Sequence, residues 1–307
     1  NKEAIMKEKI GNFTFCLFCF TSIIFIFTNN KEVAEILLNA TNLFLKRVFV
    51  SLFPMFIIND ILIHLNIPYY FYLIFNQLFL KVFKTSGLGA YILIMSLISG
   101  TPSNAYILKE LVTEGKLSNN EANHFLMFTY FSNPLFLTMM LSMIFDSHTT
   151  LKIILIHYIS NIIIGILTRK KAPQITTNKE KIEKKKKNGI LIKSINKSIP
   201  TLLMILGTIC FYMLLTYIIT YPFKDHILLK TITSGFLEIT NGLNNLTSLN
   251  IYSKIKEIIA IAIISFGGLS IHTQIKAILE DTQMNYKFFL KGRILHTIIG
   301  ILLILIF

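Results

Sequence analysis

The sequence contains no tryptophan, and only 15% of its 307 residues are charged. Soluble domains usually carry about 25% charged residues, so this composition argues against a soluble protein. Several apolar runs approach the roughly 20 residues that a helix needs to cross a bilayer. These features predict an all-α, polytopic membrane protein with no separate soluble domain. In the absence of tryptophan, tyrosine and phenylalanine must supply the aromatic belts at the membrane interfaces.

Cysteines and catalytic motifs are also scarce. The three cysteines lie in apolar runs, and the pair Cys16 and Cys19 has no second pair to complete a metal site. We interpret them as small hydrophobes. The chain has no G-x-S-x-G, H-E-x-x-H or Walker sequence, and His157, Ser160 and Asn161 are interpreted as polar residues inside a helix. We expect no enzyme, no metal and no cofactor, apart from a coupling Na⁺ or H⁺ that the sequence leaves open.

Acidic residues are outnumbered: 16 Asp and Glu stand against 30 Lys and Arg, for a net charge of +14. Eleven of the basic residues fall between Arg169 and Lys197. Basic loops beside membrane spans mark the cytoplasmic side, so we interpret this loop as a topology signal and expect no nucleic-acid partner. The alternative is a polybasic site for anionic lipid or RNA.

The apolar runs divide the chain into four predicted parts. The N-terminal part comprises residues 1–46, and the first membrane repeat comprises residues 47–168. The Lys-rich cytoplasmic loop at 169–197 separates it from the second membrane repeat at 198–307. The N-terminal part should hold an uncleaved span at Asn12–Thr28 and an interfacial amphipathic helix at Lys31–Lys46. Further spans are expected at Arg47–Leu65, Leu151–Thr168, Ile199–Tyr221 and Asn285–Phe307, with an interfacial helix at Tyr69–Lys84.

Four apolar segments are interrupted by glycine, proline or clustered polar residues, which stop helices. The interruptions are "SGTPSN" at 99–104, "FSNP" at 131–134, "EITN" at 238–241 and "SFGGLSIHTQ" at 265–274. The first and third are predicted to be tips of re-entrant helical hairpins, and the other two to be breaks in spanning helices. Their order is the same in both repeats, and the lysine distribution predicts that the repeats are inverted. Inverted repeats with paired broken helices are typical of transporters.

Irregular backbone at membrane depth persists where it lines a cavity enclosed by protein. We therefore expect the four interruptions to bind a solute. The predicted substrate-binding residues are Ser99, Gly100, Thr101, Ser103, Asn104, Ser132, Asn133, Glu238, Thr240, Asn241, Gly267, Gly268, Ser270 and Gln274. The free amides at the start of the helix after Pro102 suit an anion or a carboxylate.

Two acids lie in apolar segments, where a charge is costly and normally functional. Glu238 is the sharpest candidate of the chain, whereas Asp60 is assigned a structural role, either as a cap or in a pair with His64, one turn on. Structural alternatives apply to each interruption. They are a plain extramembrane turn at 99–104, an ordinary kink at Pro134, an outside loop at Glu238 and close helix packing at Gly267 and Gly268.

Four motifs together resemble one known family: "SGLGAYILIMSLISGTPSNA", "EANHFLMFTYFSNPLF", "LEITNGL" and "SFGGLSIHTQ". They are similar to the sporulation integral membrane protein family YlbJ, also called SpoVV. That family belongs with the nucleoside-recognition Gate proteins and is similar in plan to concentrative nucleoside transporters. The resemblance covers roughly residues 51–307. It implies solute binding at the hairpin tips and helix breaks, and dipicolinate as the cargo during spore formation.

The leading hypothesis is therefore a secondary carrier of a small polar solute, such as dipicolinate, in the cytoplasmic or forespore membrane of a bacterium. A dianion is compatible with Glu238 only if that carboxyl is protonated, pairs elsewhere or binds a cation. A nucleoside carrier is the second hypothesis. The third is a membrane scaffold or signalling protein whose basic loop binds lipid or a partner; deleting residues 174–187 would then abolish function. A homo-oligomer is left open.

Overall fold

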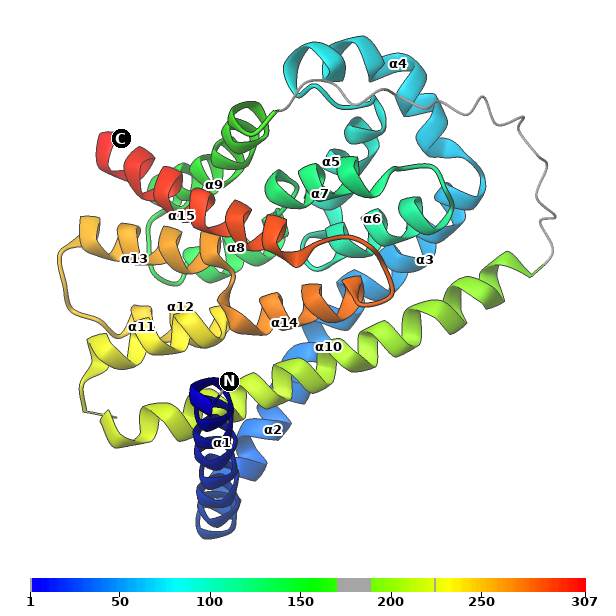
Figure 1. Cartoon of the computed structure of the whole chain (residues 1–307). Coiled ribbons are helices and arrows are strands. Elements are labelled where there is room, and N and C mark those ends of the chain that lie inside the picture. The colour runs from blue at the N-terminus through cyan, green and yellow to red at the C-terminus, as the bar shows by residue number, and fades with distance from the viewer. Residues whose placement is uncertain (1, 170–188, 224) are drawn as a thin grey trace.

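The computed structural model describes residues 2–169, 189–223 and 225–307, and these form helices joined by short turns (Figure 1). The first half of the chain contains α1 (Lys2–Thr28), α2 (Asn30–Leu43), the π-helical turn η1 (Phe44–Phe49), α3 (Val50–His64), α4 (Ile67–Val82), α5 (Leu88–Ser99), α6 (Ser103–Thr113), α7 (Asn119–Phe128), α8 (Pro134–Leu141) and α9 (Ser147–Leu167). The second half contains α10 (Ile190–Thr220), the 3-10 turn η2 (Tyr221–Phe223), α11 (Ile227–Leu237), α12 (Ile239–Thr247), α13 (Ser253–Phe266), α14 (Gly268–Leu279) and α15 (Tyr286–Ile306).

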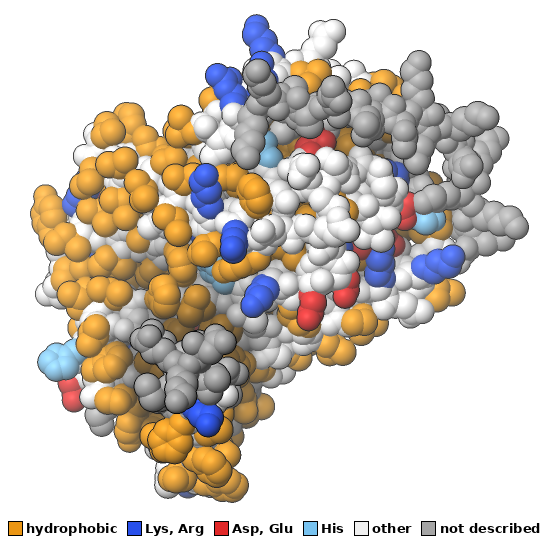
Figure 2. All heavy atoms as spheres, viewed as in Figure 1, with side chains coloured by type: hydrophobic (Ala, Val, Ile, Leu, Met, Phe, Trp, Pro, Cys, Tyr) orange, Lys and Arg blue, Asp and Glu red, His pale blue; other side chains and the backbone are white. Residues whose placement is uncertain are grey.

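Five helical segments in the described part of the chain are long and apolar enough to cross a membrane. They are Asn30–His64, Ser147–Leu167, Ile190–Phe223, Ser253–Leu279 and Tyr286–Ile306. Their outer surfaces are apolar too, and hydrophobic side chains spread widely over the face seen in Figure 2. Lipid tails match such a surface, whereas water does not. The prediction of an all-α polytopic membrane protein is confirmed.

The N-terminal helices differ from those expected. The predicted interfacial helix at Lys31–Lys46 and the span at Arg47–Leu65 form one continuous helical run, Asn30–His64. The reason is local, because no glycine or proline interrupts residues 31–46. In α1, the apolar stretch is Cys16–Thr28, shorter than the span expected at Asn12–Thr28.

Helix α10 also begins earlier than predicted. Gly189, with a φ of 78°, opens it, so the last residues of the predicted loop 169–197 are helical and the span does not begin at Ile199. Residues 170–188 of that loop lie outside the described residues. In Figure 1, α10 runs along one side of the bundle, against α2, α3, α11 and α14.

Each of the four predicted interruptions is a gap between two helices. Residues 100–102 separate α5 from α6, and residues 129–133 separate α7 from α8. In the second half, Glu238 separates α11 from α12, and Gly267 separates α13 from α14. Local chemistry explains each gap: Gly100 and Gly267 have positive φ angles, Asn133 precedes a proline, and Glu238 is extended.

One hydrophobic cluster positions the site. Phe56 of α3 stacks on Tyr106 of α6, with ring centroids 4.2 Å apart, and Leu202 and Ile205 of α10 pack in the same cluster. These side chains are buried. Helices α3, α6 and α10 are thereby fixed to one another at their middles.

The break at Gly267 gives a first prediction. Gly267 has a φ of 93°, and a Cβ there would lie 2.6 Å from Tyr130 Oη. Gly267→Ala is expected to lower the free energy of unfolding by about 1–3 kcal/mol, measured as thermal unfolding in detergent. The matched control is Gly207→Ala in α10, where nothing lies within 4 Å of the added methyl group. It should be neutral or stabilise by up to about 1 kcal/mol; equal effects of both changes would contradict the assignment.

Candidate functional site

A cavity of about 510 Å³ lies where the four helix breaks meet. This volume is in the range of small-molecule pockets, roughly 300–1,000 Å³. Its polar lining residues are Lys46, Arg47, Ser51, Ser99, Thr101, Tyr130, Ser132, Asn133, Glu238, Thr240, Ser270 and Gln274. Apolar side chains from η1, α3, α8, α10, α12 and α14 complete the wall, so the cavity is a mostly apolar pocket with a few polar groups.

The structure brings together most, but not all, of the predicted site residues. Those that line the cavity are Ser99, Thr101, Ser132, Asn133, Glu238, Thr240, Ser270 and Gln274. Those outside its lining are Gly100, Ser103, Asn104, Asn241, Gly267 and Gly268. Gly100 and Gly267 lie in the turns between helices, Gly268 begins α14, and Asn241 contributes its backbone N–H to a helix cap. Ser103 and Asn104 are buried in the first turn of α6.

The breaks of the first half are joined by side-chain hydrogen bonds. Asn133 Oδ1 accepts hydrogen bonds from the N–H groups of Leu135 and Phe136 and so caps α8, while its Nδ2 donates to Ile98 O at 2.9 Å. Thr101 Oγ1 donates to Phe131 O at 3.0 Å. The break between α5 and α6 is thereby fastened to the break between α7 and α8.

The breaks of the second half are joined by close packing. Glu238 Oε2 accepts a hydrogen bond from Asn241 N at 2.8 Å and caps α12. Gly268 packs so closely that a Cβ there would lie 3.2 Å from Leu237 O and 3.3 Å from Glu238 Cα. The carboxylate of Glu238 is thus already engaged by a helix N-terminus, where a negative charge is stabilised.

Four helix N-termini therefore meet at one cavity. The residue before α6 is Pro102, that before α8 is Asn133 and that before α12 is Glu238, and all three line the wall, as does Ser270 in the first turn of α14. Side chains cap α8 and α12, whereas α6 and α14 have no side-chain cap. Uncapped N-terminal amides carry a partial positive charge and favour anions.

Two cationic side chains add to this positive potential. Lys46 and Arg47 of η1 line the cavity and are exposed, so they lie where it meets the surface. Arg47 Nη1 lies 3.8 Å from Met140 Sδ, a weak acceptor. Glu238 is the single carboxylate in the lining. The potential of the cavity is therefore positive, which favours a negatively charged ligand.

The helix C-termini behind the cavity are held by a buried arginine. Arg293 of α15 has no exposed surface, and its Nη2 donates to Met127 O at 3.1 Å while its Nη1 donates to Ser265 O at 3.3 Å. These carbonyls belong to the last turns of α7 and α13. The negative ends of the two broken helices thus stabilise the guanidinium. Among the described residues, Arg293 forms no ion pair with a carboxylate.

Two neutral histidines and a tyrosine complete this cluster. Arg293 Nη1 donates to His296 Nδ1 at 2.7 Å, so the proton of that ring is on Nε2, which donates to His157 O at 2.9 Å. His157 Nε2 in turn accepts from Ser132 N at 3.1 Å. The guanidinium carbon also lies 3.9 Å from the ring centroid of Tyr130, a residue that lines the cavity.

A comparison with known proteins finds a similar membrane protein. Over 289 aligned residues the chain is 28% identical to the "Sporulation integral membrane protein YlbJ" of Bacillus subtilis (strain 168), and the match covers 81% of this chain and 71% of that protein. The chain is similar to YlbJ over most of its length. It is thus a YlbJ-like integral membrane protein that crosses the membrane several times.

Two other comparisons are negative. No family model matches the chain. No solved structure matches it.

Several residues of this site are not evident from the sequence. Lys46 and Arg47 look like interfacial charges, although the unbroken helical run around them was a usable signal. Arg293 looks like a cytoplasmic charge beside Lys291, and His157 and Asn161 look like ordinary helix residues. Their roles depend on contacts between distant segments. No group of three or more His, Cys, Asp or Glu within 2–169, 189–223 and 225–307 could hold a metal ion.

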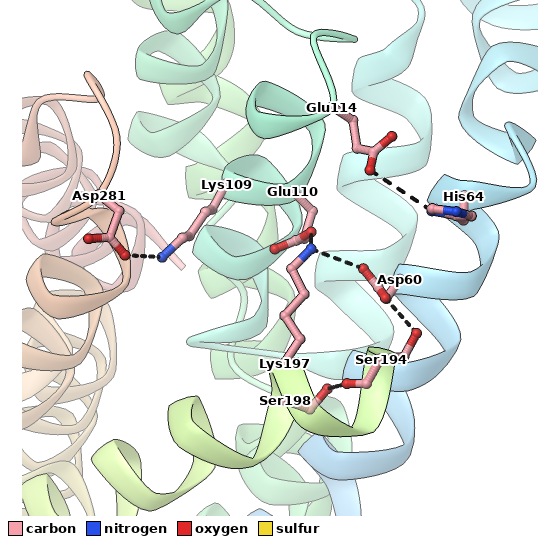
Figure 3. Close-up of polar contacts among 9 residues, drawn as sticks. All are labelled: Asp60, His64, Lys109, Glu110, Glu114, Ser194, Lys197, Ser198 and Asp281. Carbon is pink, nitrogen blue, oxygen red and sulfur yellow. Dashed lines mark hydrogen bonds and ion pairs between the residues drawn. The ribbon is translucent and has the colours of Figure 1, made fainter. Parts of the chain in front are cut away.

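The expected pairing of Asp60 with His64 is wrong. Among the described contacts, Asp60 pairs with Ser194 and Lys197 of α10, and His64 Nδ1 lies 3.9 Å from Glu114 Oε1 (Figure 3). Lys197, expected in a solvated loop, is instead part of α10 with its side chain directed at two acids.

The arginine cluster gives a second prediction. Arg293→Lys should lower the free energy of unfolding by about 3 kcal/mol or more, because one ammonium cannot reach all four acceptors that the planar guanidinium joins. These acceptors are Met127 O, Ser265 O, His296 Nδ1 and Asn161 Oδ1. The measurement is the unfolding temperature and the monodisperse fraction in detergent. Lys291→Ala, an exposed position on the same helix, is the control and should change neither. A fully stable Arg293→Lys protein would show that the guanidinium does not hold the two broken helices.

Proposed function

We propose that this YlbJ-like protein is a secondary carrier of a small organic anion, and that dipicolinate is the first substrate to test. The observation that carries the proposal is the meeting of four helix N-termini at one cavity. The positive N-terminal ends of α6 and α14 favour carboxylates, and Lys46 and Arg47 attract an anion to the entrance. The apolar wall suits an aromatic ring.

The capping role of Glu238 removes the main objection to an anionic cargo. An acid facing a dianion would repel it if its charge were free. Here one carboxylate oxygen is bound to the Asn241 N–H at the start of α12, so its charge is compensated by that helix end. The carboxylate supports the wall of the cavity, and the solute meets the N-termini of α6 and α14.

The paired breaks supply a mechanism of alternating access. The breaks of the first half are tied together by Asn133 and Thr101, and those of the second half are packed together at Gly268. Each half therefore moves as a unit around the cavity between them. In this proposal the halves are inverted repeats, the two helix pairs are re-entrant hairpins, and the solute alternates between the sides of the membrane.

The cellular setting follows from the same proposal. The carrier works in the cytoplasmic or forespore membrane during sporulation, with the basic loop 169–197 on the cytoplasmic side. It catalyses no reaction and has no nucleic-acid partner. Its partners are the solute and the bilayer, and its assembly as a homo-oligomer is left to direct measurement.

Ligand-dependent stability tests the substrate. Dipicolinate at 100 times its dissociation constant should raise the free energy of unfolding of the detergent-purified protein by about 2.7 kcal/mol. The double change Lys46→Gln and Arg47→Gln should remove most of this shift, because it removes both cationic side chains of the cavity. Lys81→Gln, an exposed lysine on α4 outside the cavity, is the control and should keep the full shift.

Uridine, tested beside dipicolinate, separates the two cargo classes. A shift with uridine alone, unaffected by the double change, would replace the anion with a nucleoside. Uptake of dipicolinate into proteoliposomes, compared with protein-free vesicles, tests transport itself. If neither ligand shifts the unfolding and neither is taken up, the carrier proposal fails.

A further inference from the structure

A cluster of buried charges lies beyond the cavity, between α3, α6 and α10 (Figure 3). Lys197 of α10 pairs with Asp60 Oδ1 of α3 at 3.3 Å and with Glu110 Oε2 of α6. Ser194 Oγ donates a hydrogen bond of 2.5 Å to the other oxygen of Asp60. Two carboxylates from different helices thus share one lysine.

The charges of this cluster do not balance. Two carboxylates and one ammonium leave a net charge of −1, and one proton brings the sum to zero. The Glu110 side chain is only 2% exposed and that of Asp60 12%, so an unbalanced charge is costly here. The Lys197 side chain is 41% exposed, so the cluster has contact with the surface through which a proton can arrive.

A buried aromatic pair adjoins the two carboxylates. Tyr106 precedes Glu110 by one helical turn and is 2% exposed. Its stacking partner Phe56 precedes Asp60 by one turn. The stacked rings thus lie one helical turn from both carboxylates.

Helices α3 and α10 line the solute cavity, and so does Pro102, the residue before α6. Along α3 the order is Leu52 at the cavity, Phe56 and then Asp60. In the α6 segment the order is Pro102 at the cavity, Tyr106 and then Glu110. Eight residues of helix span roughly 12 Å. Helix α10 follows the same path in reverse, from Lys197 through Leu202 to Ile205 at the cavity. Rigid helices therefore connect the charge cluster to the solute.

From these contacts we infer that Asp60, Glu110 and Lys197 form the proton-binding site that couples a proton gradient to solute movement. This inference rests on the proposed carrier function and names its coupling ion. The ligand is a proton because the Lys197 ammonium already occupies the position between the carboxylates that a metal cation would take.

Protonation of Glu110 weakens its ion pair with Lys197 and so loosens α6 from α10. The start of α6, where the solute binds, can then change its position relative to α10. The proton binds one carboxylate oxygen and leaves from the same oxygen, and no bond other than O–H forms or breaks. The cluster is therefore a two-state element biased by protonation.

Other titratable groups surround the pair. They are Tyr91 of α5, Lys109, Glu114 and Tyr106 of α6, His64 of α3, Asp281 after α14 and the exposed Lys276 of α14. Lys109 pairs with Asp281 at 3.1 Å and His64 with Glu114 (Figure 3). Each can affect a pH profile, so the test must separate them from the Asp60–Glu110 pair.

The main experiment compares two assays on the full chain in proteoliposomes: counterflow of labelled dipicolinate, and its accumulation under an imposed pH gradient. Glutamine at position 110 mimics a permanently protonated glutamate. Glu110→Gln should therefore lower gradient-driven accumulation by on the order of tenfold or more, with a much smaller loss of counterflow. Asp60→Asn should act in the same direction.

The matched control is Asp281→Asn, which removes an exposed acid paired with the neighbouring Lys109 of α6. It should leave both assays unchanged. Equal accumulation by wild type, Glu110→Gln and Asp60→Asn would overturn the proton site while leaving the carrier intact. Accumulation that follows a Na⁺ gradient and ignores the pH gradient would also overturn it.

A second measurement does not depend on the cargo. Dicyclohexylcarbodiimide modifies buried carboxylic acids in their protonated form, and peptide mass mapping locates the product. Modification of Glu110 should rise as the pH falls, and Asp60→Asn should move the pH at which it rises. Absent or pH-independent modification at both acids would overturn the proton site. If modification follows pH but wild type carries no dipicolinate, the proton site stands and the proposed substrate fails.

Discussion

The rest of the structure depends on how the broken helices satisfy their ends, because a bilayer offers no hydrogen-bond partners to free backbone groups. The C-terminal carbonyls of α7 and α13 are bound by the Arg293 guanidinium. Helices α8 and α14 begin after these two breaks, and their N-terminal turns line the cavity. At each break, the negative C-terminal end of the first helix is compensated by the Arg293 cation. The positive N-terminal end of the second helix is left facing the cavity.

This division of helix ends also explains why a buried arginine needs no carboxylate. Burial of a guanidinium is costly unless its donors are bonded and its charge is compensated. Four acceptors meet Arg293, two of them carbonyls at negative helix ends, and the Tyr130 ring covers it. A carboxylate partner would add a negative charge close behind the cavity proposed to bind an anion, and the present arrangement avoids that charge.

The sequence predicts the breaks well because their signals are local. A glycine that needs a positive φ, an asparagine before a proline and an acid in an apolar run each identify themselves within a few residues. Charges brought together by packing carry no such signal. Lys46, Arg47 and Arg293 look like interfacial charges until η1 and α15 are placed beside the breaks. The sequence places Lys197 in a loop because the first eight residues of α10 contain two lysines and so resemble the end of the basic loop before them.

The unpaired polar groups beside the cavity bear on the proposed carrier mechanism, in which the protein alternates between two states. Asn104 is fully buried and neither atom of its amide has a partner among the described residues, and the same holds for Ser103 Oγ and Gln274 Oε1. Each such group costs about 1–3 kcal/mol. They lie in or adjoin the two uncapped helices, α6 and α14. A solute or a shifted helix that gave these polar groups hydrogen-bond partners would remove this cost. The resulting conformation would be stabilised relative to the conformation described here. The cost is therefore concentrated in the helices that the carrier mechanism requires to move.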